Sequence, residues 1–372
     1  MRPRPGARAY AGPVHLTATT WRARAADHAR RADAFTADRR ERRLAGRKHA
    51  VEDFLYEYYP FSPGKARRWH PGAGVELLPD DDAPDRVHPE PSDRARDAGP
   101  AGPTDPSAPA DPPSSTGPAS PGGSTASGST AGGSAVGGTT AGWTAAGGTT
   151  DVADLTERAQ WRWHRRTARG GVELDVDAFL ADRQQGVRWV HSLLDRTQSR
   201  PGRFDCFGWH EWAMVYRQED HRHSHPLRLG QDGTDRAVES ASIRCGHVDA
   251  FRFFTEPARP LNDRLPTRAN QLEMDQPGCL HVSMDLLRWC LVLGPAVSGD
   301  LLLDCAEHAL AVRYLDMAAA PYDLADLGVR PVPIETPAGR AEYVRRQREQ
   351  TERAAPLRGR LLEVTTALLD AA

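Results

Sequence analysis

One stretch of the chain, residues 80–150, cannot supply a hydrophobic core. It begins acidic and proline-rich and continues in Gly, Ser, Thr and Ala repeats such as Thr139-Thr140-Ala141-Gly142. With almost no large apolar side chain, burial cannot offset the entropy that is lost when a backbone becomes ordered. We therefore expect a disordered insert at 80–150. It separates a basic N-terminal helical segment (1–79), expected to pack on the core, from a main helical domain (151–372) that carries the functional site.

The remaining residues carry apolar side chains mainly at helical spacing. Strand signals are scarce, and strands do not alternate regularly with helices. The pattern predicts a mainly α fold, a multi-helix globular domain with long ordered loops. We expect helices over the ranges 20–47, 49–59, 156–169, 177–199, 280–293, 301–317 and 338–369, with a potential interruption of the last at Pro356.

The composition favours a cytoplasmic protein. Its five cysteines are odd in number and form no CxxC pair, which favours reduced thiols over disulfides or a thiolate zinc site. No apolar run approaches the length of a membrane span, so we expect no membrane partner. The net charge is −2, yet residues 1–75 carry sixteen Lys or Arg against seven Asp or Glu. This basic segment either neutralises nucleic-acid phosphate or is a helix with arginines on its solvated face.

Chemically useful side chains are concentrated in residues 205–254. Five of the fourteen histidines, two of the five cysteines and two of the nine tryptophans lie there, so we expect the functional site in this stretch. Within it, Glu211 follows His210, and a buried glutamate beside a histidine can act as a general base with a raised pKa. The alternative is a Glu/His pair that is held by hydrogen bonds in the core beside Trp209 and Trp212.

Histidines at alternate positions indicate a metal site. In an extended segment His221, His223 and His225 share one face, which suits imidazole ligands on one ion. His247 and Asp249 repeat this spacing and offer a nitrogen and an oxygen ligand. The alternative is an ordinary histidine-rich surface loop. The ExxH pattern of di-iron bundles is missing, as are the GxGxxG, GxxxxGK[ST], GxSxG and HExxH signatures.

Several motifs carry a family resemblance. The longest are VEDFLYEYYPFSP (51–63), CFGWHEWAMVYR (206–217), IRCGHVDAFRFF (243–254) and QPGCLHVSMDL (276–286). With these motifs, the chain outside the insert resembles a family of actinobacterial proteins commonly labelled 3-methyladenine DNA glycosylase. It carries no helix-hairpin-helix glycosylase motif.

The resemblance implies a DNA-repair hydrolase that cleaves the N-glycosidic bond of alkylated bases in DNA without a cofactor. Such base-excision enzymes flip the nucleotide, hold the cationic base between aromatic rings and use a carboxylate for the chemistry. The residues that the resemblance offers are Trp209, Trp212 and Tyr216 for stacking, Glu211, Asp249 and Asp205 for catalysis, and Arg67, Arg68 and Trp69 for the DNA backbone.

A second hypothesis is a metal-dependent enzyme, an oxidoreductase or hydrolase, that acts on a small molecule. It binds iron, zinc or manganese through histidine and carboxylate ligands. Its candidate ligands are His210, Glu211, His221, His223, His247, Asp249 and His281.

Overall fold

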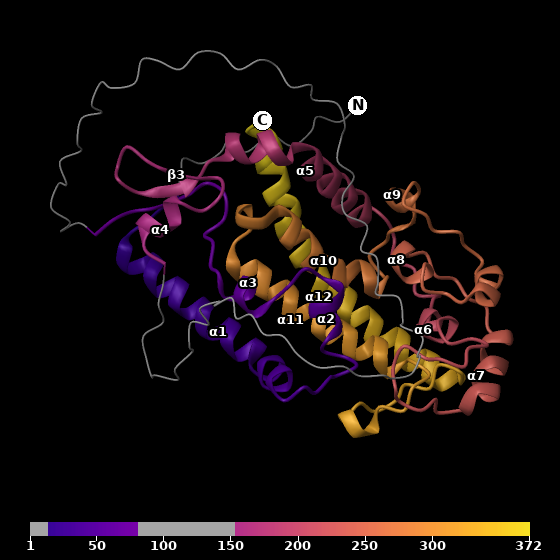
Figure 1. Cartoon of the computed structure of the whole chain (residues 1–372). Helices are drawn as coiled ribbons and strands as arrows, with labels where there is room; N and C mark the ends of the chain where they lie inside the picture. Colours follow the sequence, from indigo (N-terminus) through magenta and orange to yellow (C-terminus); the bar gives the residue numbers. More distant parts are fainter. Residues whose placement is uncertain (1–13, 81–152) are drawn as a thin grey trace, which may run out of the picture. The chain divides into compact units, whose positions relative to one another are not determined.

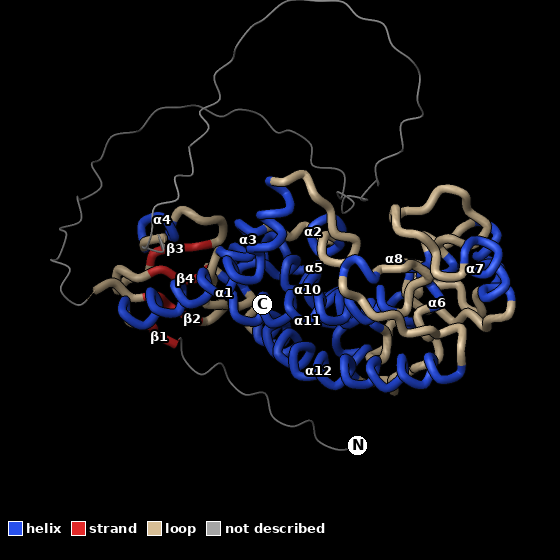
Figure 2. The backbone as a smooth tube through the Cα atoms, turned by 90° about the horizontal axis from the view of Figure 1, so that it is seen from below, coloured by secondary structure: helices blue, strands red, loops and turns tan. Residues whose placement is uncertain are grey.

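The computed structural model describes residues 14–80 and 153–372, and helices dominate them (Figures 1 and 2). The mainly α fold is thereby confirmed. The insert expected at 80–150 lies, apart from residue 80, outside the described residues. None of the described helices is long and apolar enough to span a membrane.

The elements follow one another in an order dominated by helices. The α-helices are α1 (Ala18–Leu44), α2 (Phe54–Tyr58), α3 (Pro63–Arg67), α4 (Leu155–Ala159), α5 (Val176–Gln198), α6 (Trp209–Ala213), α7 (Gly230–Glu239), α8 (Val248–Phe251), α9 (Gln271–Met274), α10 (Leu280–Leu293), α11 (Gly299–Ala318) and α12 (Pro337–Asp370). Short 3₁₀ helices are η1 (Glu256–Leu261), η2 (Gly294–Ala296) and η3 (Ala325–Leu327), and the strands are β1 (Val14–Leu16), β2 (Val75–Leu77), β3 (His164–Arg166) and β4 (Val172–Leu174).

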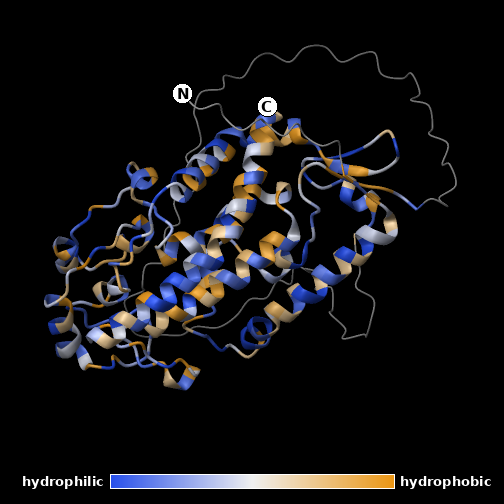
Figure 3. Cartoon of the chain, turned by 180° about the vertical axis from the view of Figure 1, so that it is seen from behind, coloured by the Kyte–Doolittle hydropathy of each residue, from blue (hydrophilic) through white to orange (hydrophobic). Residues whose placement is uncertain are grey.

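Four long helices form the centre of the fold. Helix α10 packs against α11 and α12, and α12 also packs along α5. Helix α10 buries side chains on nearly every side, as expected for a helix that is surrounded by others. Figure 3 shows apolar and polar residues interleaved along the long helices, and some of the polar ones, such as Asp285 and Asp316, are buried. The helices expected at 177–199, 280–293 and 301–317 correspond to α5, α10 and α11.

Helix α12 continues through Pro356 without a break, so the potential interruption at this residue does not occur. Proline lacks the N–H that would bond one turn back, which weakens a helix locally. Ala354 and Leu361 on either side are fully buried. Packing against the neighbouring helices therefore holds this turn in place.

The described N-terminal residues belong to the same compact unit as residues 153–372. Helix α1 packs on α3 and on α11. Arg31 of α1 donates hydrogen bonds to Asp304 and Glu307 of α11, at 2.7 and 2.8 Å. Much of the arginine content of this helix is therefore paired with carboxylates of its own chain.

A small sheet differs from the helix that we expected at 156–169. Its four strands of three residues each follow the order β1-β2-β4-β3, with β1 parallel to β2 and the other pairs antiparallel. Helix α4 ends at Ala159, Trp163 adopts a left-handed backbone (φ 61°), and β3 begins at His164. The tight turn at Gly170-Gly171 then returns the chain as β4, so strand pairing replaces the expected helix.

Two glycines of α12, Gly339 and Gly359, differ in how closely other atoms pack around them. A methyl group at Gly339 would collide with the backbone carbonyl of Pro333, whereas a methyl group at Gly359 meets nothing within 4 Å. We predict that Gly339→Ala lowers the free energy of unfolding by about 1–3 kcal/mol, the usual cost of overpacking. Gly359→Ala should be neutral or stabilising by up to about 1 kcal/mol, because alanine favours the helix. Chemical denaturation measures both, and equal losses in the two variants would contradict the packing described.

Candidate functional site

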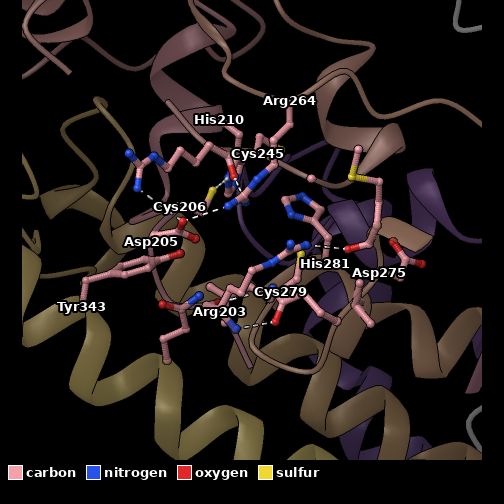
Figure 4. Close-up of a pocket in the computed structure, with 17 residues that line it drawn as sticks. Arg203, Asp205, Cys206, His210, Cys245, Arg264, Asp275, Cys279, His281 and Tyr343 are labelled. Atoms are coloured by element: carbon pink, nitrogen blue, oxygen red, sulfur yellow. Dashed lines mark hydrogen bonds and ion pairs between the residues drawn. The ribbon is translucent and has the colours of Figure 1, made fainter. Parts of the chain in front are cut away.

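Two adjoining cavities share His281 as a lining residue. Both are partly open to solvent, and their volumes of about 460 and 420 Å³ include some of that open space. Figure 4 shows the first cavity, which gathers side chains from α6, α10, α12 and the loops between them. Its chemically active lining residues are Arg203, Asp205, Cys206, His210, Arg244, Cys245, Arg264, Asp275, Cys279, His281 and Tyr343.

A chain of side-chain contacts runs from Cys206 and His210, which line the first cavity, to Asp316 behind them. The Cys206 sulfur lies 3.6 Å from Nδ1 of His210, and Nε2 of His210 lies 2.8 Å from Oδ1 of Asp316. His210 and Asp316 are buried, whereas Cys206 is half-buried and lines the cavity. A nucleophile, a base and a group that orients the base are thus within reach of one another.

A tight turn brings Cys206 and His210 together. Phe207 and Gly208 both have left-handed backbones, with φ of 51° and 82°, so helix α6 begins only at Trp209. Within residues 205–217, only Trp209–Ala213 form an α-helix. A side chain at Gly208 would press on Tyr343 and Ala319, at 3.2 and 3.3 Å, so glycine is needed there.

Within the triad of Cys206, His210 and Asp316, neighbouring groups shift the pKa values of the thiol and the imidazole. The neighbouring Cys245 thiol and His210 hold the pKa of the Cys206 thiol well below its usual range, although burial opposes this shift. Burial by itself would lower the pKa of His210, but the Asp316 carboxylate and the Cys206 sulfur raise it well above its usual value. Both directions favour a thiolate beside an imidazolium, the reactive form of a cysteine nucleophile.

An arginine completes the buried charge cluster. The Arg313 guanidinium donates hydrogen bonds of 2.7 Å to Glu211 and to the second oxygen of Asp316. Arg313, Glu211 and Asp316 are all buried. With a protonated His210, two positive charges lie among the carboxylates of Glu211 and Asp316 and the Cys206 thiolate, so each buried charge has an opposite charge beside it. Glu211, expected as a candidate catalytic carboxylate, is bonded to Arg313 and lines the second cavity.

Histidines from three segments converge around His281. Its ring centroid lies 4.6 Å from that of His210 and 5.1 Å from that of His247. Nε2 of His247 lies 3.4 Å from Oδ2 of Asp285, whose other oxygen accepts a hydrogen bond from the Tyr59 hydroxyl. Burial and the neighbouring charged His210 lower the pKa of His281 well below its usual value, so this ring is neutral.

The other two predicted carboxylates are neutralised by arginines. Asp249 is buried and forms ion pairs with Arg268 and, at 2.7 Å, with Arg288. Burial would raise the pKa of Asp249, but Arg288 and its neighbours hold it below the usual range. Asp205 lines the first cavity and forms an ion pair of 2.8 Å with Arg264, which Figure 4 marks by a dashed line.

Two groups of side chains within the described residues have the spacing of metal ligands. One is Cys206, His210 and Cys245, and the other is His210, His281 and Asp316. Two predicted ligands, His210 and His281, thus meet a carboxylate that sequence reasoning missed. The second group has the composition of a two-histidine, one-carboxylate site. However, both oxygens of Asp316 already have hydrogen-bond partners, His210 for Oδ1 and Arg313 for Oδ2.

The alternating histidines do not share one face. Their segment bends, and His221 lies 2.9 Å from the side-chain oxygen of Gln231. His223 packs edge-on against Tyr322 and lines the second cavity, where burial lowers its pKa to about 3. His225 instead lies 3.5 Å from Asp326. Neither metal-ligand group found in the described part of the chain includes any of the three.

The aromatic residues expected to stack on a base lie in the core. Trp209, Trp212 and Tyr216 are buried and line neither cavity. The Trp212 ring nitrogen donates to the carbonyl of Ala319 at 2.8 Å, and the Tyr216 hydroxyl donates to Glu239 at 3.0 Å. No base could stack on these rings without unpacking the core.

The residues expected at a DNA backbone line neither cavity. Arg67 is half-buried and forms an ion pair with Asp33, 3.2 Å away. Arg68 is exposed above the Trp161 ring, and Trp69 is buried. Of these three side chains, only Arg68 is exposed to solvent.

Sequence reasoning missed Asp316, Arg313 and the contact between Cys206 and His210. The four-residue spacing between Cys206 and His210 was not a sufficient signal, because a turn with two left-handed residues, and not a helix, brings them together. Asp316 lies more than a hundred positions away, and no local spacing connects it to His210. Comparisons of the chain with protein-family models, with curated proteins and with solved structures find no match.

We predict that Asp316→Asn makes Cys206 an ordinary thiol. Asp316 raises the pKa of His210, so its loss leaves His210 neutral and removes the positive charge that stabilises the thiolate. Alkylation of Cys206 by iodoacetamide at about pH 6.5 should then slow about tenfold or more and recover near pH 9, above the usual thiol pKa of roughly 8.5.

Peptide mass spectrometry measures this rate for Cys206 alone. Asp304→Asn is the matched control, because Asp304 lies on the same helix but forms ion pairs with Arg31 and Arg360 away from both cavities. A rate at low pH that is the same in wild type and Asp316→Asn would contradict the role given to Asp316.

Proposed function

We propose that this protein is a cysteine-dependent enzyme of the acyl-transfer class, most simply a hydrolase of a small molecule. The single observation that carries the proposal is the continuous contact from the Cys206 sulfur through His210 to Asp316 at the wall of a cavity.

Each member of the triad has a distinct role. The Cys206 thiolate attacks the carbonyl carbon, the bond to the leaving group breaks, and His210 gives its proton to that group. Water then attacks the thioester while His210 accepts a proton, which releases the acid and restores the thiol. Asp316 is a positioning residue, because it fixes the orientation of the imidazole and stabilises its charged form.

The two hypotheses drawn from the sequence have less support in the geometry. A metal ion at His210, His281 and Asp316 would have to break the hydrogen bond between His210 and Asp316 and would lie beside the Arg313 guanidinium. A glycosylase would need its aromatic cage elsewhere, because the expected rings are packed in the core. Base excision stays a prediction, which release of free 3-methyladenine from methylated DNA would test.

The covalent step can be observed with p-nitrophenyl acetate as the probe. We expect a burst of nitrophenolate close to one equivalent and an acetyl group on Cys206 in the peptide map. Cys206→Ser should reduce the burst about 100-fold or more, because a serine hydroxyl is a far weaker nucleophile at neutral pH. Cys279→Ser is the matched control and should keep the burst, since Cys279 lines the same cavity but burial raises its pKa. Acetylation that is unchanged in Cys206→Ser would contradict the proposal.

Elemental analysis separates the thiol proposal from the metal alternative. For protein purified without an affinity tag after metal-replete growth, we expect less than about 0.1 equivalent of iron, zinc or manganese, since a tightly bound catalytic metal would persist near one equivalent. We also expect the burst to survive a chelator. A stoichiometric metal that is lost in His281→Ala would favour the metal enzyme instead.

A further inference from the structure

Three arginines line the first cavity, and they are not equally paired. Asp205 lies 2.8 Å from Arg264 and 3.7 Å from Arg244, and Arg244 also pairs with Asp263 at 3.1 Å. Arg203 has no carboxylate partner among residues 14–80 and 153–372. The cavity therefore contains a guanidinium whose charge the described protein does not neutralise.

The backbone around Arg203 is fixed by a second loop. Its N–H donates to the side-chain oxygen of Gln276 at 2.7 Å, and the same oxygen accepts from the N–H of Gly278 at 2.8 Å. A side chain at Gly278 would collide with the Arg203 carbonyl, so the two loops are in close contact. One guanidinium nitrogen of Arg203 donates to the carbonyl of Met274 at 3.0 Å. Arg203 is thus held in position before any ligand binds.

The environment of Arg203 favours an anion. Its Nε is buried and has no hydrogen-bond partner among the described residues. Burial, followed by the neighbouring Arg264, lowers the pKa of this guanidinium. An unpaired cation in a partly desolvated site costs free energy that an incoming anion removes, and arginine matches the geometry of carboxylate and phosphate.

We infer that the substrate carries an oxyanion, a carboxylate or a phosphate, and that Arg203 binds it next to Cys206. This inference rests on the proposed thiol function and adds the charge class of the substrate. Arg264 and Arg244 also line the cavity, but they form ion pairs with Asp205 and Asp263, so the inference rests on Arg203.

Two alkylating reagents of nearly equal size test the charge preference. Iodoacetate is an anion and iodoacetamide is neutral, and both form the same bond with the Cys206 sulfur. At each thiol, the rate with iodoacetate is divided by the rate with iodoacetamide. We expect this ratio to be about tenfold higher at Cys206 than for the thiol of glutathione, because a nearby unscreened positive charge attracts the anionic reagent. Arg203→Gln should remove this preference.

Arg200→Gln is the matched control and should leave the ratio unchanged. Arg200 lies three residues earlier, carries the same charge and also donates to a backbone carbonyl, that of Asp275 at 3.0 Å, but it does not line the cavity. A second measurement needs no variant. Inorganic phosphate or acetate, compared with sodium chloride at equal ionic strength, should slow alkylation of wild-type Cys206 by iodoacetamide, and the two anions distinguish phosphate from carboxylate recognition.

The outcomes separate the two proposals. In the first outcome, Cys206 reacts rapidly with iodoacetamide at low pH, but its iodoacetate/iodoacetamide rate ratio equals that of glutathione and neither phosphate nor acetate slows its alkylation. The oxyanion inference is then overturned and the thiol function stands. If Cys206 reacts with neither reagent below the usual thiol pKa, the thiol function fails and the inference fails with it.

Discussion

The hydrogen bond between His210 and Asp316 is the interaction on which the rest of the site depends. It joins α6, which follows a strained turn, to α11 in the centre of the helical core. Because both groups are buried, the bond is strong and the loss of either partner would leave an unpaired charge, at a cost of about 3–5 kcal/mol. The same bond fixes which imidazole nitrogen faces Cys206.

The surrounding helices explain why so polar a cluster is tolerated in the interior. Arg313 and Asp316 lie one turn apart on α11, so the Arg313 guanidinium reaches Asp316 on its own helix as well as Glu211 of α6. Tyr343 of α12 and Ala319 at the end of α11 leave no room for a side chain at Gly208, in the turn that carries Cys206. The reactive sulfur thus lies on a short, constrained segment that the long helices support.

The sequence was informative about the helices, and the stretch 205–254 supplies several residues that line the first cavity. Apolar spacing predicted α5, α10 and α11 well, because each has a long buried face. It failed at residues 156–169, where the left-handed residue Trp163 lies between α4 and β3. Such backbone geometry depends on tertiary packing and leaves little trace in composition.

The contacts between the candidate side chains were harder to predict than the helices. His210, His247 and His281 do converge, but the alternating histidines at 221–225 turn to three different neighbours. The partner of His210 is Asp316, which lies in an unremarked part of a long helix. Long-range pairing of this kind follows from how helices pack, and a single sequence does not encode it in any local pattern.

The most direct test of this account is the titration of the Cys206 thiol itself. The ultraviolet absorbance of the thiolate is measured against pH in the wild type, and the same titration of Cys206→Ser is subtracted. The triad predicts that the difference signal is already fully developed at about pH 6, well below the usual thiol pKa of roughly 8.5. A signal that develops only above about pH 8 would mean that Cys206 is an ordinary buried thiol, and it would contradict the role assigned to His210 and Asp316.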